Sequence, residues 1–423
     1  METSLICLAA ALVGGLMLSR LTKLLNLPAV TAYLVAGLAL GPFCLGALNV
    51  PGLGFNSLAQ VEGLSIITQV ALGFIAFTIG NEFRLSQLKA MGSSAITIGV
   101  LQAVITTVAV DIVLIVLHLL FPHVISLPCA ITLGAIASAT APAATLMVVR
   151  QYKADGPLTR LLMLVVAIDD AVGLLLFSVS FGIATALANG QISILAVVVE
   201  PILEILLSLA LGSIMGWLLN WVEQFFHSRS KRMTISIAFV LLTVGLSMLE
   251  FQIGPVYCRF SLLLVCMMTG TIFCNICDTS EELMDRVDGW TMPLNILFFV
   301  ISGAELNLNV VVQASTLLVG LIYILARSAG KYYGSAISCR LTHQSKAIRS
   351  NLGITLLPQA GVALGMASTV AKELPNEAAL CNVVLFGVLV YELIGPTLTK
   401  RSLLAAGEIQ PEGRTSARKI NDK

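Results

Sequence analysis

Charged residues are scarce in this sequence. Asp, Glu, Lys and Arg make up 11% of its 423 residues, whereas hydrophobic residues make up 57%. A soluble domain carries about 25% charged residues, so this chain has too few of them to cover a surface that faces water. The mean hydropathy of +0.95 predicts that lipid is the solvent for much of the chain. The net charge of +1, without a basic stripe, gives no indication of a nucleic-acid partner.

Several chemical motifs are also missing. The sequence contains no nucleophile constellation, no metal-binding motif and no phosphate-binding loop, so we expect neither an enzyme nor a resident cofactor. Most of the nine cysteines lie inside apolar runs, where a thiol behaves as a small hydrophobe, and we expect no disulfide framework. The first apolar run, residues 4–19, lacks the preceding basic residues of a signal peptide. Arg20 and Lys23 follow it instead, which indicates a retained helix.

Long apolar runs recur along the whole chain. A bilayer core about 30 Å thick requires about 20 apolar residues per helix. Segmentation on that basis predicts an all-α polytopic membrane protein with thirteen transmembrane helices, followed by a disordered tail over residues 403–423. The predicted helices span residues 4–20, 28–48, 61–81, 92–121, 128–149, 161–187, 193–222, 234–250, 256–275, 291–307, 313–338, 350–371 and 378–399.

The basic residues support this segmentation. If thirteen helices alternate in direction, twenty of the twenty-four Lys and Arg residues fall in the loops and tail on one side. The opposite loops contain only Lys372, and Arg259, Arg327 and Lys331 lie within helices. Because cytoplasmic loops carry an excess of Lys and Arg, the N-terminus is predicted outside and the C-terminus in the cytoplasm. We therefore expect a multi-pass protein of the cytoplasmic (inner) membrane.

Two predicted helices are interrupted by proline at corresponding places. An odd middle helix allows two six-helix repeats of inverted topology, and the fifth helix of each then contains Pro142 or Pro358. Proline removes a backbone hydrogen bond inside a helix, and such breaks persist in membranes only where protein or a water-filled cavity satisfies the freed groups. Paired interrupted helices in two halves are typical of a transporter's binding site. We therefore predict two crossing broken helices, with Gln359 in the second break.

Two adjacent acids, Asp169 and Asp170, lie near the middle of an apolar helix. On insertion scales an acid at the helix centre costs about 2.5–3.5 kcal/mol. Adjacent helical positions point about 100° apart, so one carboxylate can face a cavity while the other faces a neighbouring helix. Burial and mutual repulsion both disfavour the charged forms. The pair is therefore predicted to hold either protons or a small cation such as Na⁺.

Arg327 and Lys331 are the obvious counter-ions for these acids. They lie one turn apart on one face of a predicted helix, and spacing alone does not choose between them. A lysine has the more tunable pKa and can release a proton, whereas an arginine remains charged and is better suited as a fixed counter-ion. Snorkelling of both side chains to the interface is the alternative interpretation. Glu392, inside the last predicted helix, is a secondary site candidate.

Seven stretches in order along the chain resemble the second class of monovalent cation/proton antiporters. This family includes the NapA-like sodium/proton exchangers and the membrane domains of Kef-type proteins. Asp-Asp beside a broken helix is the most specific point of resemblance. The stretches are LPAVTAYLVAGLALGP (27–42), ALGFIAFTIGNEFRLSQLKAMG (71–92), GAIASATAPAATLMVV (134–149), AIDDAVGLLLF (167–177), PLNILFFVISGAELNL (293–308), ARSAGKYYG (326–334) and YELIGPTLTK (391–400).

The resemblance implies a homodimer in which a core moves against a scaffold in an elevator-type cycle. It implies that Asp170 binds the ion, that Asp169 pairs with a base, and that Ser138 and Thr140 adjoin the ion. The implied divisions are scaffold helices in 1–91 and 233–309, core helices in 92–187 and 310–402, a linker helix in 188–232, and the tail in 403–423.

The sequence departs from the family at two places. Relatives often carry an acid where this chain has Ala141, and a Lys or Arg where it has Gln359. These departures increase the weight on Arg327 and Lys331 as the balancing charges. The predicted function is exchange of protons for a monovalent cation, most simply Na⁺, with membrane lipid as the surroundings. A K⁺/H⁺ antiporter and a sodium-coupled symporter for an organic solute are the alternatives.

Overall fold

The computed structural model describes residues 2–24, 28–48, 50, 54–81, 93–189, 199–253, 256–277, 280–305, 314–374, 377 and 379–409. This part of the chain is helical apart from one short hairpin and the connecting turns. The helices are α1 (Glu2–Leu24), α2 (Ala29–Leu40), η1 (Leu45–Leu48), α3 (Leu58–Glu62), α4 (Ser65–Asn81), α6 (Ser93–Leu120), α7 (Leu127–Ser138), α8 (Pro142–Gln151), α9 (Pro157–Asn189), α10 (Glu200–Glu223), α11 (Arg229–Ser247), α12 (Leu262–Ile276), α13 (Ser280–Glu305), α14 (Ala314–Leu341), α15 (Lys346–Thr355), α16 (Gly361–Glu373) and α17 (Ala379–Ala405).

The predicted all-helical membrane fold is confirmed. Each of the thirteen predicted segments overlaps at least one of these helices. Within the described residues, seven helical spans are long and apolar enough to cross a membrane, and α1, α4 and α12 contain shorter apolar helices. The number of thirteen crossings stays a prediction.

One predicted helix begins too early in the sequence. Strands β1 (Phe251–Ile253) and β2 (Val256–Cys258) form an antiparallel hairpin, and α12 starts only at Leu262. The sequence between the strands is Gly-Pro, a turn dipeptide, and the flanking aromatic and β-branched residues favour strands. The predicted start at residue 256 was therefore wrong because hydropathy alone does not distinguish this hairpin from a helix end.

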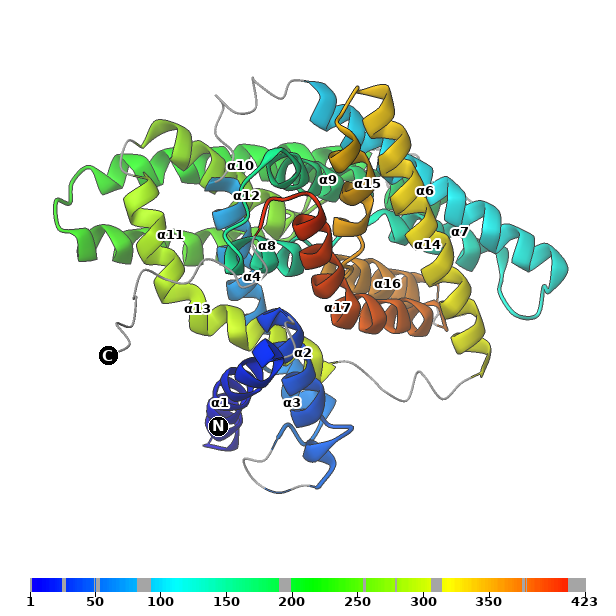
Figure 1. The fold of residues 1–423 in the computed structure, drawn as a ribbon, viewed down its shortest axis with the longest axis horizontal. Helices are drawn as coiled ribbons and strands as arrows, with labels where there is room; N and C mark the ends of the chain where they lie inside the picture. The colour runs from blue at the N-terminus through cyan, green and yellow to red at the C-terminus, as the bar shows by residue number, and fades with distance from the viewer. Residues whose placement is uncertain are drawn as a thin grey trace.

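The helices pack in two groups. Helices α6, α7, α9 and α14 to α17 contact one another, whereas α1, α2, α4 and α10 to α13 form the second set of contacts. In Figure 1, α6, α7 and α14 lie on the right and α10 to α12 on the left. The main contacts between the groups are those of α2 and α4 with α8, of α2 with α17, and of α10 and α12 with α9. Helix α8, one half of the first interrupted helix, thus lies where the groups meet.

Glycines allow α2 and α13 to pack backbone against backbone. A Cβ at Gly37 would lie 2.0 Å from the carbonyl oxygen of Val300, and one at Gly303 would lie 2.2 Å from that of Leu34. Small residues at such positions are what permits close helix approach in a membrane, where van der Waals packing replaces the hydrophobic effect. The second group is therefore built around a tight helix pair.

The chain after α17 folds back onto α9. The carboxylate of Glu408 accepts hydrogen bonds from the backbone N–H groups of Leu158 and Thr159, at 2.6 and 2.7 Å, and from the Thr159 hydroxyl at 2.6 Å. A negative charge that accepts from the first N–H groups of a helix satisfies its free donors and complements its dipole. Residues 403–409 are therefore ordered, contrary to the predicted disorder, and residues 410–423 lie outside the described part of the chain.

Replacing Glu408 with Ala is expected to lower stability by about 1–2 kcal/mol, because α9 loses its N-terminal cap. Thermal unfolding of the purified protein in detergent measures this loss. Arg160→Gln is the matched control, since it removes an exposed ion pair with Asp155 near the same helix end. Such exposed pairs contribute about 0–1 kcal/mol. Equal effects of the two variants would contradict the capping role.

Candidate functional site

The predicted crossing of two broken helices is confirmed. Helix α7 ends at Ser138 and α8 begins at Pro142, while α15 ends at Thr355 and α16 begins at Gly361. Between them the two segments touch through the Ala141 backbone N–H, which donates to the Pro358 carbonyl at 2.8 Å. The proline rings remove backbone donors at both places, so each interruption leaves carbonyl groups that need partners from elsewhere.

Side chains satisfy every carbonyl of the last turn of α7. The last four carbonyls of a helix have no partner within it, and in a membrane they need partners from the protein or from water. All four acceptors are buried. The donors are Ser138 Oγ to Ala135 at 2.7 Å, Gln359 Nε2 to Ile136 at 3.0 Å, Arg327 Nε to Ala137 at 2.9 Å and Lys331 Nζ to Ser138 at 2.5 Å.

Arg327 joins the two interruptions. Its guanidinium is fully buried and donates to the carbonyls of Ala137, Ala139 and Leu357 at 2.9, 2.7 and 2.6 Å. It also lies 4.5 Å from the centre of the Tyr391 ring, in cation–π range. A positive charge near the C-terminal ends of two half-helices is favourable for both dipoles. Arg327 therefore donates its hydrogen bonds to carbonyl groups. Among the described residues it forms no ion pair with an aspartate.

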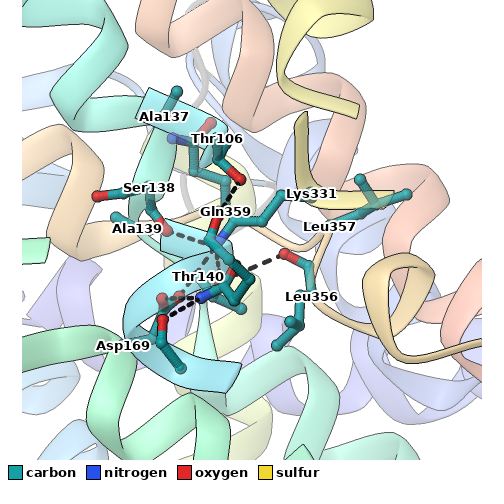
Figure 2. A network of polar contacts seen from close by, with 12 residues as sticks. Thr106, Ala137, Ser138, Ala139, Thr140, Asp169, Lys331, Leu356, Leu357 and Gln359 are labelled. Carbon is teal, nitrogen blue, oxygen red and sulfur yellow. Dashed lines mark hydrogen bonds and ion pairs between the residues drawn. The ribbon is translucent and has the colours of Figure 1, made fainter. Parts of the chain in front are cut away.

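Lys331 is the base that pairs with an aspartate. Its Nζ lies 3.0 Å from Asp169 Oδ2, and both side chains are fully buried. The same ammonium donates to Thr140 Oγ1 at 2.9 Å, to Gln102 Oε1 at 3.1 Å and to the carbonyl of Ser138. Figure 2 shows Lys331 pointing into the crossing, with Asp169 and Thr140 around its tip. These contacts choose between the two bases that spacing alone left open.

Asp170 has different surroundings from its neighbour Asp169. The residue is 7% exposed, and its Oδ1 has no hydrogen-bond partner among the described residues. Asp169 is fully buried and is neutralised by Lys331. The neighbouring Gly173, one turn along α9, lies against the break, since a Cβ there would be 3.5 Å from Ser138 Oγ. One carboxylate is therefore locked into the structure, whereas the other has an oxygen open to a proton or cation.

The sequence matches the family model for the transmembrane region of sodium/hydrogen exchangers over residues 8–404. The chain belongs to the sodium/hydrogen exchanger family. It is therefore a multi-pass membrane transporter and not an enzyme, and the cations and protons of the family are substrates rather than cofactors.

Solved structures of one archaeal antiporter have the same fold as this exchanger. A structure of the sodium proton antiporter MjNhaP1 from Methanocaldococcus jannaschii at pH 8 matches with a TM-score of 0.70 at 19% identity, over 96% of this chain and 99% of that one. An electron-microscopy map of MjNhaP1 gives 0.73 at 18% identity, over 97% and 98%. No curated protein matches the sequence.

Two further predicted residues of this exchanger, Thr140 and Gln359, also lie at the crossing. Thr140 donates to the Leu356 carbonyl at 3.3 Å while it accepts from Lys331, so its hydroxyl joins the two broken helices. Gln359 lies in the second interruption and is fully buried. Its amide donates to Ile136 and exchanges hydrogen bonds with Tyr323. A neutral amide therefore satisfies the carbonyl at this position in the exchanger.

Gln102 on α6 belongs to the site, although the sequence did not predict it. Its amide nitrogen donates to Asp169 Oδ1 and its amide oxygen accepts from Lys331, so the residue bridges the ion pair. Gln102 is fully buried. A lone amide within the apolar run GVLQAVITTVAV was the available signal, because buried polar groups require partners. Its partners come from α9 and α14, which sequence spacing does not bring together.

Replacing Lys331 with Met is expected to destabilise this exchanger by about 3–5 kcal/mol, because Asp169 would keep a buried charge without its counter-ion. Adding Asp169→Asn to the same protein removes that charge, so the double variant should be more stable than Lys331→Met alone. Unfolding midpoints in detergent for the wild type, both single variants and the double variant measure the coupling. Additive losses across the four proteins would contradict the ion pair.

Proposed function

We propose that this protein exchanges protons for Na⁺, with proton and cation competing for Asp170. The observation that carries the proposal is the difference in hydrogen-bond and ion-pair partners between two adjacent acids. Lys331 neutralises Asp169, whereas Asp170 is 93% buried and retains an oxygen without a partner. A buried carboxylate that is not paired must take up a proton or a cation to remain stable. Asp170 meets the requirement for a shared binding site.

Competition for one carboxylate couples the two fluxes. Release of the proton opens Asp170 to the cation, and binding of the cation favours proton release, which is reciprocal linkage. A bare carboxylate is costly inside the bilayer, so only the protonated or cation-bound core crosses cheaply. This selection prevents a futile return with an empty site. Asp169 adjoins the cation with its oxygens held by Lys331 and Gln102, and Ser138 and Thr140 supply neighbouring polar groups.

The movement proposed is of elevator type. Helices α6 to α9 and α14 to α17 would form the core and move against a scaffold of α1 to α4 and α11 to α13, with α10 as the link. The limited set of helices that join the two groups supports this division, as does the tight α2–α13 pair. Arg327, Gln359, Pro142 and Pro358 would maintain the crossing during the movement. We place the scaffold at a homodimer interface in the cytoplasmic membrane, with the N-terminus outside.

Transport by the purified protein in liposomes tests this proposal. Vesicles with an acidic interior and a pH-sensitive dye receive Na⁺, Li⁺ or K⁺ in turn, with and without an imposed membrane voltage. We expect Na⁺ to release the interior protons, and we expect the voltage to change the rate if two protons exchange for one cation. Vesicles without protein supply the background.

Four outcomes would overturn the assignment. A response to K⁺ alone would make the protein a K⁺/H⁺ antiporter, and accumulation of an organic solute with Na⁺ would make it a symporter. A channel would instead give single-channel currents at fixed ion gradients. Absence of proton movement with any cation would overturn the exchange of protons altogether.

A further inference from the structure

A cavity of about 160 Å³ lies where the two helix groups meet. Its walls include α2, α4 and α13 from one group, and α17 with both broken helices from the other. A cavity of this size holds several water molecules if polar groups line it. The polar lining residues are Thr68, Gln69, Ser302, Glu305 and Glu392.

The charged residues that line this cavity are both acids. Glu305 is half-buried at the C-terminal end of α13, whereas Glu392 is 3% exposed in the middle of α17. Glu62 adds a further negative charge close to Glu305. The dipole of α13 also presents its negative end at Glu305. A cleft lined by charges of one sign concentrates counter-ions, so this cavity favours cations.

Glu392 supplies an open ligand at the buried end. Its Oε2 atom has no hydrogen-bond partner among the described residues. An uncompensated buried charge is strongly unfavourable, and a bound cation removes that penalty. Carboxylate, amide and hydroxyl oxygens are the ligands that hard cations prefer, and Glu392, Gln69 and Thr68 provide one of each.

The cavity reaches the crossing of the broken helices. Ala141, Pro142 and Ala360 from the two interruptions belong to its wall. Helix α17 lies directly against the second interruption, since a Cβ at Gly395 would be 3.0 Å from the Pro358 ring. The cavity therefore extends from the half-buried Glu305 to the extended segments, and Gly173, one turn along α9 from Asp170, lies against the first of them.

We propose that this cavity is a second site for a partly hydrated monovalent cation, with Glu392 as its buried ligand and Glu305 at its entrance. The cation would occupy it on the way between solution and Asp170. The proposal rests on the proposed exchange of Na⁺ for protons and adds a waiting site to it.

Binding of Na⁺ to variants that lack Asp170 tests the second site directly. Asp170→Asn protein in detergent is titrated with NaCl against choline chloride at constant ionic strength, and the thermal midpoint is recorded. A ligand that binds only the folded protein raises this midpoint. We expect a saturable Na⁺-dependent rise in Asp170→Asn that is lost in Asp170→Asn/Glu392→Gln. Absence of the rise in the first protein, or its survival in the second, would overturn the site.

Asp111→Asn is the matched control for these titrations. Asp111 is another acid within a helix of the core group whose Oδ1 has no partner among the described residues, and it lies outside the cavity lining. The Na⁺-dependent rise should survive in Asp170→Asn/Asp111→Asn. Its loss there would show that any buried acid has the same effect and would overturn the assignment to Glu392.

Transport kinetics give a second readout. In an otherwise wild-type protein, Glu392→Gln should raise the KM for Na⁺ by about tenfold at low ionic strength, with the maximal rate retained, because the local cation concentration falls. Glu392→Asp should restore most of it. A fall in the maximal rate with unchanged KM would indicate a structural role and overturn the site. Continued transport by Asp170→Asn would overturn the proposed function instead, and the titrations would still report on Glu392.

Discussion

Asp170→Asn is expected to reduce Na⁺-dependent proton movement in liposomes to the level of vesicles without protein. Asparagine has nearly the same shape as aspartate, but it carries neither a charge for a cation nor a titratable proton at neutral pH. Because one oxygen of Asp170 has no partner among the described residues, the substitution removes no described hydrogen bond at that atom. The variant should therefore fold and unfold like the wild type.

The appropriate comparison for this variant is Asp111→Asn, which removes another acid of the core group. Asp111 packs against Gly134 on α7, where a Cβ would lie 1.8 Å from its Oδ1. Asp111→Asn should retain transport if the position of the acid matters and not only its presence in the membrane. Transport by Asp170→Asn at the wild-type rate, with matched protein content, would contradict the proposed role of Asp170.

The outline of the site was predictable because it contains residues that are energetically unfavourable inside a membrane helix. Asp169, Asp170, Pro142 and Pro358 each carry a cost inside a membrane helix, so their presence indicates a compensating structure. The hydrogen bond from the Ala141 N–H to the Pro358 carbonyl confirms that the two interruptions meet. A residue that is energetically unfavourable in a membrane helix therefore indicates a functional site from sequence alone, even when its partners in the fold are unknown.

The different partners of Arg327 and Lys331 were not predictable in this way. The two residues are one turn apart on α14, and either one is a reasonable partner for an acid. What separates them is the position of acceptors from distant segments, with Ala137 and Leu357 close to one and Asp169 close to the other. Such positions depend on how α7, α9 and α15 pack, and helical spacing within α14 does not contain that information.

The ordered contact of the C-terminal segment with α9 was also not predictable from hydropathy. Glu408 is a single charged residue in a polar stretch, so composition favoured disorder. Its role comes from the free N–H groups of Leu158 and Thr159, nearly 250 residues earlier in the sequence. A capping contact over that separation leaves no local pattern. The same limit applies to Gln102, whose partners lie on other helices.

Arg327→Met is expected to be the most destabilising of these substitutions. The methionine fills part of the volume but leaves the carbonyls of Ala137, Ala139 and Leu357 without the guanidinium donor. Each buried acceptor left without a partner costs about 1–3 kcal/mol, so the total is roughly 3–9 kcal/mol. That range is comparable to the whole stability of a typical domain, about 5–15 kcal/mol. We expect little folded protein by size-exclusion chromatography in detergent.

Arg327→Lys keeps the measurement informative if the methionine variant does not fold. An ammonium keeps the charge but lacks the planar fork that reaches three carbonyls at fixed angles, so its unfolding midpoint should lie between those of the wild type and Arg327→Met. Arg259→Lys is the matched control, because Arg259 is half-exposed and pairs with Glu204 at 2.7 Å. The change at Arg327 should exceed the change at Arg259. Equal shifts would mean that the crossing does not depend on the fork of Arg327, and water or backbone rearrangement would then have to satisfy the three carbonyls.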